Sequence, residues 1–129
     1  MTKFHIIIPA AGSGTRMGLS QPKQYLLIHT QTLIERVVRV FDNISLVHSI
    51  HIALHSNDEI WKTLNLSFSS KVNTHYCGGG SRAETVLNTL KIIKDHVDPN
   101  DWILVHDAAR PGIEEKDVKH LTHALRNDS

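Results

Sequence analysis

The chain has one cysteine, no long apolar run and almost no excess of charge of either sign. Cys77 cannot form an intramolecular disulfide, which favours a reducing compartment. No apolar run approaches the roughly 20 residues of a membrane-spanning helix, and the run that begins at Ile6 soon meets Pro9 and is too short for a signal peptide. Fourteen Lys and Arg residues against 13 Asp and Glu residues argue against a general nucleic-acid binder. We therefore expect a cytoplasmic protein that binds neither nucleic acid nor membrane.

Apolar strand-like runs alternate with amphipathic helical segments along the whole chain. The run Phe4 to Ile8 is typical of a strand buried on both faces, and the other predicted strands are Val47 to Leu54, Val72 to Tyr76 and Trp102 to Val105. The segments with helical periodicity are Thr32 to Phe41, Asp58 to Leu64, Ser81 to about His96 and Glu115 to Arg126. This alternation predicts one α/β domain over residues 1–129, with a mostly parallel sheet flanked by helices.

Three of the predicted strands run directly into sequences that carry glycines or charged side chains. These sequences are PAAGSGTRMG, CGGGSRAET and HDAARP. Ligands of parallel α/β sheets bind beyond the carboxyl ends of the strands, and those ends lie on one edge. We therefore expect the three sequences to converge on a single site.

The first of these sequences resembles two familiar glycine-rich loops but fits neither. A dinucleotide-binding fingerprint needs its third glycine before Gly18 and a helix where Pro22 lies, and a P-loop needs Gly-Lys followed by Ser or Thr. What remains is a loop that brings backbone N–H groups close to phosphate oxygens, with Arg16 as a bidentate donor and Lys23 as a compact cation. The alternative is a plain glycine-rich turn with two solvated cations.

The second and third sequences add a possible helix N-terminus and a carboxylate. Ser81 and Glu84 form a capping-box pattern, so the glycines before them predict free N–H groups for an anion or a base edge, unless they are only a hinge. Thr85 lies in the first turn, where its hydroxyl can instead bond to its own helix. Asp107 suits Mg²⁺, unless it closes an Asx-turn, and Arg110 is a candidate second phosphate anchor.

Taken together, these motifs resemble the 2-C-methyl-D-erythritol 4-phosphate cytidylyltransferases. The matching pieces, in order and with matching spacing, are residues 9–18, Pro22-Lys23-Gln24-Tyr25, Gly78-Gly79 with Arg82-Ala83, and residues 106–111. The resemblance implies a Rossmann-like nucleotidyltransferase fold and transfer of a cytidylyl group from CTP to methylerythritol phosphate, with release of pyrophosphate. It also implies dependence on Mg²⁺ and a tendency to form dimers.

The same resemblance implies a role for each matching residue. Arg16 and Lys23 would hold the triphosphate and stabilise charge at the α-phosphorus as the catalytic cations. The residues that would bind the nucleotide are Ala10, Ala11, Gly12, Gly14, Gly79 and Thr85, the last two by recognising the cytosine. Asp107 and Arg110 would lie near the metal and the sugar phosphate, with Asp107 as the metal ligand.

Members of that family are about twice as long as this chain. Their C-terminal half supplies more of the sheet, a dimerising arm and further residues around methylerythritol phosphate. We therefore expect this chain to retain the CTP half-site, to associate with itself, and to be weak or inactive alone. The alternatives are a cytidylyltransferase for ribitol 5-phosphate or another polyol phosphate, and a non-catalytic CTP-binding module.

Overall fold

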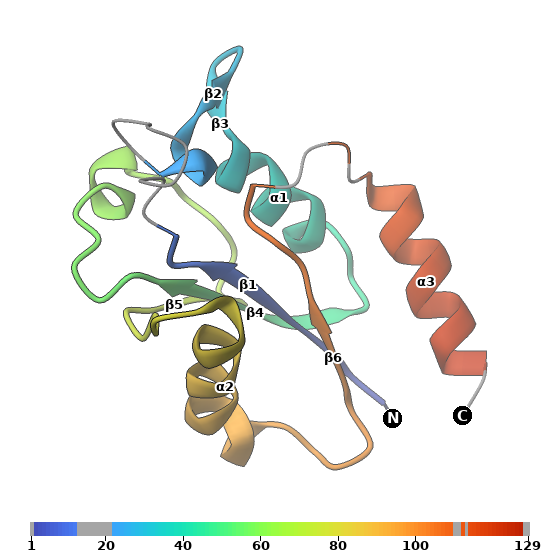
Figure 1. Cartoon of the computed structure of the whole chain (residues 1–129). Helices are drawn as coiled ribbons and strands as arrows, with labels where there is room; N and C mark the ends of the chain where they lie inside the picture. The colour runs from blue at the N-terminus through green and yellow to red at the C-terminus, as the bar shows by residue number, and fades with distance from the viewer. Residues whose placement is uncertain (1, 13–21, 110–111, 113, 128–129) are drawn as a thin grey trace.

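A computed structural model of the chain describes residues 2–12, 22–109, 112 and 114–127 (Figure 1). The strands are β1 (Phe4–Ala10), β2 (Leu27–Ile28), β3 (Gln31–Thr32), β4 (Val47–Leu54), β5 (Val72–His75) and β6 (Trp102–Val105). The α-helices are α1 (Leu33–Asp42), α2 (Arg82–Ile93) and α3 (Glu115–Asn127), and the 3₁₀ turns are η2 (Lys23–Tyr25), η3 (Trp61–Leu64) and η4 (Lys94–His96).

Four strands form one parallel sheet in the order β5-β4-β1-β6, which confirms the predicted α/β class. β1 lies between β4 and β6, so that Ile6 is level with Ile50 on one side and with Leu104 on the other. The remaining two strands, β2 and β3, form a small antiparallel hairpin that the sequence analysis did not predict. Strands of two residues are too short to show an alternating pattern.

Helices cover both faces of the sheet, with α1 and α3 on one side and α2 on the other (Figure 1). α1 begins as expected, because the Thr32 hydroxyl accepts a hydrogen bond from the Glu35 N–H at 3.2 Å. Its apolar side chains pack on the even-numbered residues of β1, and this contact forms the main core. The core residues from β1, α1 and β4 are Ile6, Ile8, Ala10, Ile34, Val37, Val38, Phe41, Val47, Ile50, Ile52 and Leu54.

The buried side of α2 carries two threonines beside one apolar residue. Ser81 caps the helix, since its hydroxyl accepts a hydrogen bond from the Glu84 N–H at 3.1 Å. The buried residues are Thr85, Thr89 and Ile93. Each threonine hydroxyl donates to the carbonyl four residues earlier in the chain, at 2.9 Å for Thr85 and 2.8 Å for Thr89. That bond satisfies the hydroxyl and allows it to be buried.

The helix α3 is less buried than its pattern suggests. The helical periodicity of Glu115 to Arg126 predicts that Val118, Leu121 and Leu125 face inward, but 47% of Leu121 is exposed, while Thr122 is fully buried. α3 packs along α1 over a narrow strip, and residues four apart, such as Val118 and Thr122, share that strip. The expectation for Leu121 was therefore wrong. In place of the helix predicted from Asp58 to Leu64, the structure has the 3₁₀ turn η3, and the Asp58 carboxylate accepts hydrogen bonds from the N–H groups at its start.

A chain of hydrogen-bonded side chains crosses the sheet on the face opposite α1. Asp101 bonds to His5 at 2.8 Å, His5 to Ser49 at 2.6 Å, Ser49 to His51 at 2.9 Å, and His51 to His75 at 3.0 Å. An ionised carboxylate only accepts hydrogen bonds, so the His5 Nε2–H group donates to Asp101.

The β5–α2 loop is packed tightly against the ends of two strands. The Gly78 N–H donates to the Leu54 carbonyl at 2.9 Å. A Cβ atom at Gly78 would lie 2.4 Å from the Ala11 Cβ and 3.0 Å from the Leu54 oxygen. Only a hydrogen atom fits in this position, so Gly78 brings the loop within contact of both β1 and β4. None of the helices in the described part of the chain has the length and apolar character needed to cross a membrane.

The histidine chain predicts that acid destabilises the protein. Burial, and then the nearby His75, His5 and His96, lower the pKa of His51 from 6.5 to about 4. The unfolded chain therefore takes up a proton at higher pH than the folded one, and the stability present above pH 6.5 is lost as the pH falls from 6.5 toward 4. After allowing for solvent screening, we expect a loss on the order of 1 kcal/mol between about pH 7 and pH 5.

Urea unfolding at several pH values would measure this loss. The variant His51→Asn should flatten the pH dependence, whereas His120→Gln, at an exposed position on α3, should leave it unchanged. An unaltered pH dependence in His51→Asn would contradict the prediction that His51 causes the loss of stability in acid.

The packing around Gly78 predicts a large effect of one methyl group. Gly78→Ala forces the Ala11 and Leu54 segments apart and should lower the free energy of unfolding by about 2 kcal/mol or more. Gly80→Ala is the matched control, because its Cβ would meet only the Glu84 carboxylate at 3.6 Å. We expect the control to change stability by less than about 0.5 kcal/mol in denaturant titrations. Equal effects of the two substitutions on stability would be inconsistent with the close packing of Gly78 against Ala11 and Leu54.

Candidate functional site

The described parts of the three sequences singled out above meet at the carboxyl edge of the sheet, as predicted. The Ala108 N–H donates to the Pro9 carbonyl at 3.4 Å, which joins the segment after β6 to the end of β1. Gly78 joins the segment after β5 to the ends of β1 and β4. Parallel strands impose this convergence, because all their carboxyl ends lie on the same edge.

The end of β1 presents backbone rather than side chains. Ala10 is buried and closes the strand, and Ala11 is half-buried against Gly78. Gly12 is exposed, and a Cβ atom there would meet nothing within 4 Å. These small residues leave the backbone accessible to a ligand. The predicted site residues Gly14 and Arg16 lie outside the described residues.

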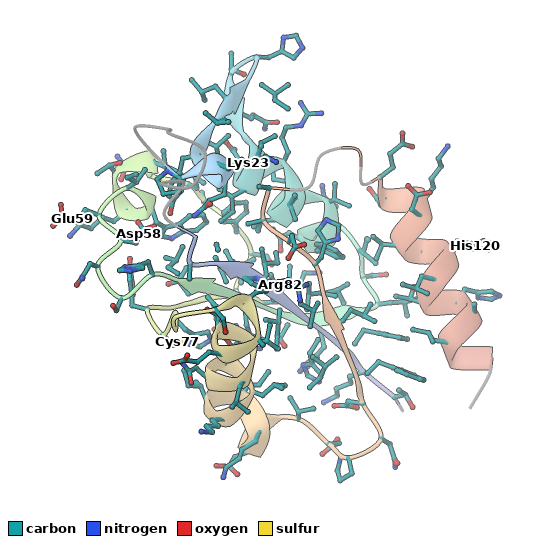
Figure 2. All side chains as sticks on the ribbon, in the orientation of Figure 1. Lys23, Asp58, Glu59, Cys77, Arg82 and His120 are labelled. Atoms are coloured by element: carbon teal, nitrogen blue, oxygen red, sulfur yellow. The ribbon has the colours of Figure 1, made fainter. Side chains whose placement is uncertain are left out.

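Lys23 begins the 3₁₀ turn η2 and is exposed, whereas the two residues after it are buried. The Gln24 amide donates to the Ala10 carbonyl at 2.8 Å, and the Tyr25 hydroxyl donates to an Asp58 carboxylate oxygen at 2.6 Å. The turn is therefore held at two points beside the end of β1. In Figure 2, the labelled Lys23 lies next to this end of the sheet.

The glycines before α2 do not offer the free N–H groups that the sequence predicts. The Gly78 N–H is bonded to Leu54, and the Gly79 N–H donates to the Thr85 hydroxyl at 3.0 Å. Thr85 also donates to the Ser81 carbonyl, so its hydroxyl bonds its own helix, as one of the two interpretations held. A base edge would have to compete with the Gly79–Thr85 bond. The expectation of free donors was wrong for these two glycines, because a buried hydroxyl needs partners of its own.

Asp107 lies just beyond β6 and forms an ion pair with Arg82 from the first turn of α2, with 2.6 Å between Arg82 Nε and Asp107 Oδ1. Both side chains are partly exposed, so the pair contributes little to stability and mainly orients the two groups. The pair connects the second and third sequences across the edge of the sheet. The third predicted residue of this group, Arg110, lies outside the described residues.

The described residues offer few ligands to a metal ion. No group of three or more His, Cys, Asp or Glu side chains within them is arranged to hold one. Mg²⁺, however, needs only one or two carboxylates when substrate phosphates and water supply the other oxygens. The Asp107 carboxylate at the mouth of the site fits that requirement as a single hard ligand, although Arg82 competes for one of its oxygens.

Four contributors to the site carried no assigned role in the sequence analysis. Gln24, Tyr25 and Arg82 were noted only as parts of matching motifs, and Asp58 only as the start of a predicted helical segment. One signal was available, because a glutamine between a lysine and an aromatic residue in a short turn needs a hydrogen-bond partner if it is buried. Nothing in the sequence indicates the pairing of Tyr25 with Asp58 or of Arg82 with Asp107.

Comparisons with known proteins agree with this geometry. Residues 4–129 match the family model of IspD, 2-C-methyl-D-erythritol 4-phosphate cytidylyltransferase. Proteins of that name from Nitrosomonas eutropha and Thiobacillus denitrificans are 41% and 38% identical to this chain, over 99% and 98% of its residues. A crystal structure of a 4-diphosphocytidyl-2C-methyl-D-erythritol synthase superimposes with a TM-score of 0.81 at 30% identity, over 95% of this chain.

The chain spans about half the length of these relatives, 56% and 54% of the two proteins and 54% of the crystallised chain. The matched portion contains the parallel sheet and all three segments that meet at its carboxyl edge. The family match covers nearly every residue of the sequence, and the fold agrees with it. The chain therefore belongs to the IspD family of cytidylyltransferases.

Proposed function

We propose that this chain carries the CTP-binding part of a 2-C-methyl-D-erythritol 4-phosphate cytidylyltransferase. The observation that carries the proposal is the arrangement at the carboxyl edge, where an anchored lysine turn, a glycine-rich helix start and an ion-paired aspartate converge. In the reaction, a phosphate oxygen of methylerythritol phosphate attacks the α-phosphorus of CTP. The bond from the α-phosphorus to the β-phosphate breaks, and pyrophosphate leaves.

This chemistry requires positioning and charge stabilisation rather than a protein nucleophile. Lys23 would neutralise charge that develops on the phosphates, together with Arg16. The backbone of Ala10, Ala11, Gly12 and Gly14 would contact the nucleotide, and Gly79 and Thr85 would recognise the base. Asp107 and Arg110 would face the sugar phosphate.

Nucleotidyltransferases commonly use a divalent metal, and we propose Mg²⁺ held by Asp107 and the substrate phosphates. When bound, the cation would offset the phosphate charge. CTP and a polyol phosphate are water-soluble substrates, in keeping with a cytoplasmic site of action. We also propose that the chain self-associates, since Trp102, Val105 and Leu121 are large apolar side chains that remain exposed.

Turnover and binding test the proposal separately. Incubation with CTP, methylerythritol phosphate and Mg²⁺ should release pyrophosphate slowly, and calorimetric titration should show that CTP binds more tightly than ATP or GTP. CTP binding without turnover would support a non-catalytic module instead. Faster turnover with ribitol 5-phosphate would identify a different polyol phosphate as the substrate. A preference for ATP or GTP would contradict the assignment of the nucleotide.

Removing the charge of Lys23 should weaken catalysis far more than folding. Lys23→Met removes a cation from the phosphates and is expected to lower the rate about a hundredfold, or by roughly 3 kcal/mol of transition-state stabilisation. Lys91→Met, at an exposed position of α2, is the matched control and should keep the wild-type rate. Pyrophosphate release measures both variants. Where turnover of the wild-type chain is too slow to measure, CTP affinity supplies the same comparison. Equal values for Lys23→Met and wild type would contradict the role of Lys23.

Asp107 should control the effect of Mg²⁺ on nucleotide binding. We expect Asp107→Asn to reduce the difference in CTP affinity between Mg²⁺ and EDTA by about tenfold, because a neutral amide is a poorer ligand for a hard cation. Asp95→Asn, in the exposed turn η4, is the control and should leave the difference unchanged. Titration of both variants with CTP, with and without Mg²⁺, measures the effect. A full Mg²⁺ effect in Asp107→Asn would assign the metal to other ligands.

A further inference from the structure

The turn that carries Lys23 is too short to hold its own position. η2 contains three residues, and its backbone bonds are the Tyr25 N–H to the Pro22 carbonyl at 3.0 Å and the Leu26 N–H to the Lys23 carbonyl at 3.1 Å. A single 3₁₀ turn has weak hydrogen-bond geometry, and isolated helical turns are unstable in water. The position of Lys23 must therefore depend on contacts outside the turn.

The first outside contact is made by Gln24. Its side chain is 5% exposed, and its Nε2 atom donates to the Ala10 carbonyl at 2.8 Å and approaches the Gly12 carbonyl at 3.5 Å. Both acceptors belong to the end of β1 and the start of the loop after it. Gln24 thus fixes the distance between the lysine turn and the backbone that is proposed to contact the nucleotide.

The second outside contact is made by Tyr25. Its ring is 2% exposed within the main core, and its hydroxyl donates to Asp58 Oδ2 at 2.6 Å. A hydrogen bond from a hydroxyl to a carboxylate at this distance is of the strong, charge-assisted kind. Burial, and then the Asp58 carboxylate, raise the pKa of Tyr25, so the hydroxyl keeps its proton over the physiological pH range.

Asp58 is itself held firmly by the segment that follows β4. Its Oδ1 atom accepts hydrogen bonds from the Ile60 and Trp61 N–H groups, both at 2.9 Å, and its own N–H donates to the His55 carbonyl at 3.0 Å. One carboxylate therefore caps η3 and anchors η2. Figure 2 labels Asp58 and Lys23 at the same end of the molecule.

We propose that Gln24 and the Tyr25–Asp58 pair are positioning residues for Lys23. They hold η2 between the end of β1 and the segment after β4, with the two residues after the lysine directed inward and the lysine outward. The proposal rests on the proposed function, in which Lys23 contacts the phosphates. A lysine side chain is long and flexible, so the position of its backbone determines how often the ammonium group reaches a phosphate.

A double-mutant cycle on CTP affinity tests whether the Tyr25 hydroxyl acts through Lys23. Tyr25→Phe keeps the buried ring and leaves Asp58 its two backbone donors, so the fold should be preserved. We expect Tyr25→Phe to weaken CTP binding by about threefold to tenfold in the wild-type chain and by less than about twofold in the Lys23→Met background. An equal loss in both backgrounds, or no loss in the wild type, would overturn the proposal.

Gln24→Met tests the other anchor, because it retains a similar volume without the N–H donors. It should weaken CTP binding to a similar extent, and again only when Lys23 is present. Tyr76→Phe and Gln31→Met are the matched controls, at an exposed tyrosine and at a half-buried glutamine in β3, and both should bind CTP as the wild type does.

Amide hydrogen exchange in the absence of nucleotide gives a readout that does not depend on the proposed function. The Tyr25 and Leu26 N–H groups close η2, and we expect Tyr25→Phe and Gln24→Met to speed their exchange at least about tenfold, with the controls unchanged. Unchanged exchange at both amides would overturn the proposal even if CTP binds. Faster exchange in both variants, together with no CTP binding by the wild-type chain, would instead refute the proposed function and leave the anchoring of η2 supported.

Discussion

The parallel pairing of β1 with β4 on one side and β6 on the other is the constraint on which the site depends. A central parallel strand must be covered on both faces, and its apolar residues supply the core under α1. The same pairing brings the carboxyl ends of β1, β4 and β6 to one level. Segments far apart in the chain then come within hydrogen-bond distance of each other, as Arg82 and Asp107 do.

Around this edge, the exposed side chains are accessible to a ligand. Buried neighbouring residues, which a ligand does not reach, hold them in position. Lys23 is exposed while Gln24 and Tyr25 are buried, and the partly exposed Arg82 follows the tightly packed Gly78. Burial gives the supporting groups fixed partners and few rotamers, which makes the positions of their neighbours reproducible. The charged groups keep their solvation until a ligand replaces the water.

The sequence predicted the sheet better than it predicted the contacts at the site. Buried strands such as Phe4–Ala10 appear as short apolar runs, and their order in an α/β chain limits the topology. The exposure of Leu121 was missed because helical periodicity shows which residues share a face, not how wide a strip the neighbouring helix covers. The Gly79–Thr85 bond and the Tyr25–Asp58 bond depend on tertiary distances that no local pattern contains. The roles given to Lys23, Gly79, Thr85 and Asp107 stay predictions, since geometry alone does not assign a ligand.

The place of β1 in the sheet also affects how the chain is made. β1 is synthesised before the other strands of this sheet, yet Phe4 pairs with Trp102 in β6, which is synthesised after them. One backbone edge of the most apolar strand therefore stays open until β6 has been synthesised. Closing so long a loop also carries an entropic cost before the pairing is gained, which slows folding. During synthesis, the strand that later organises the site is thus the segment most exposed to pairing with another chain.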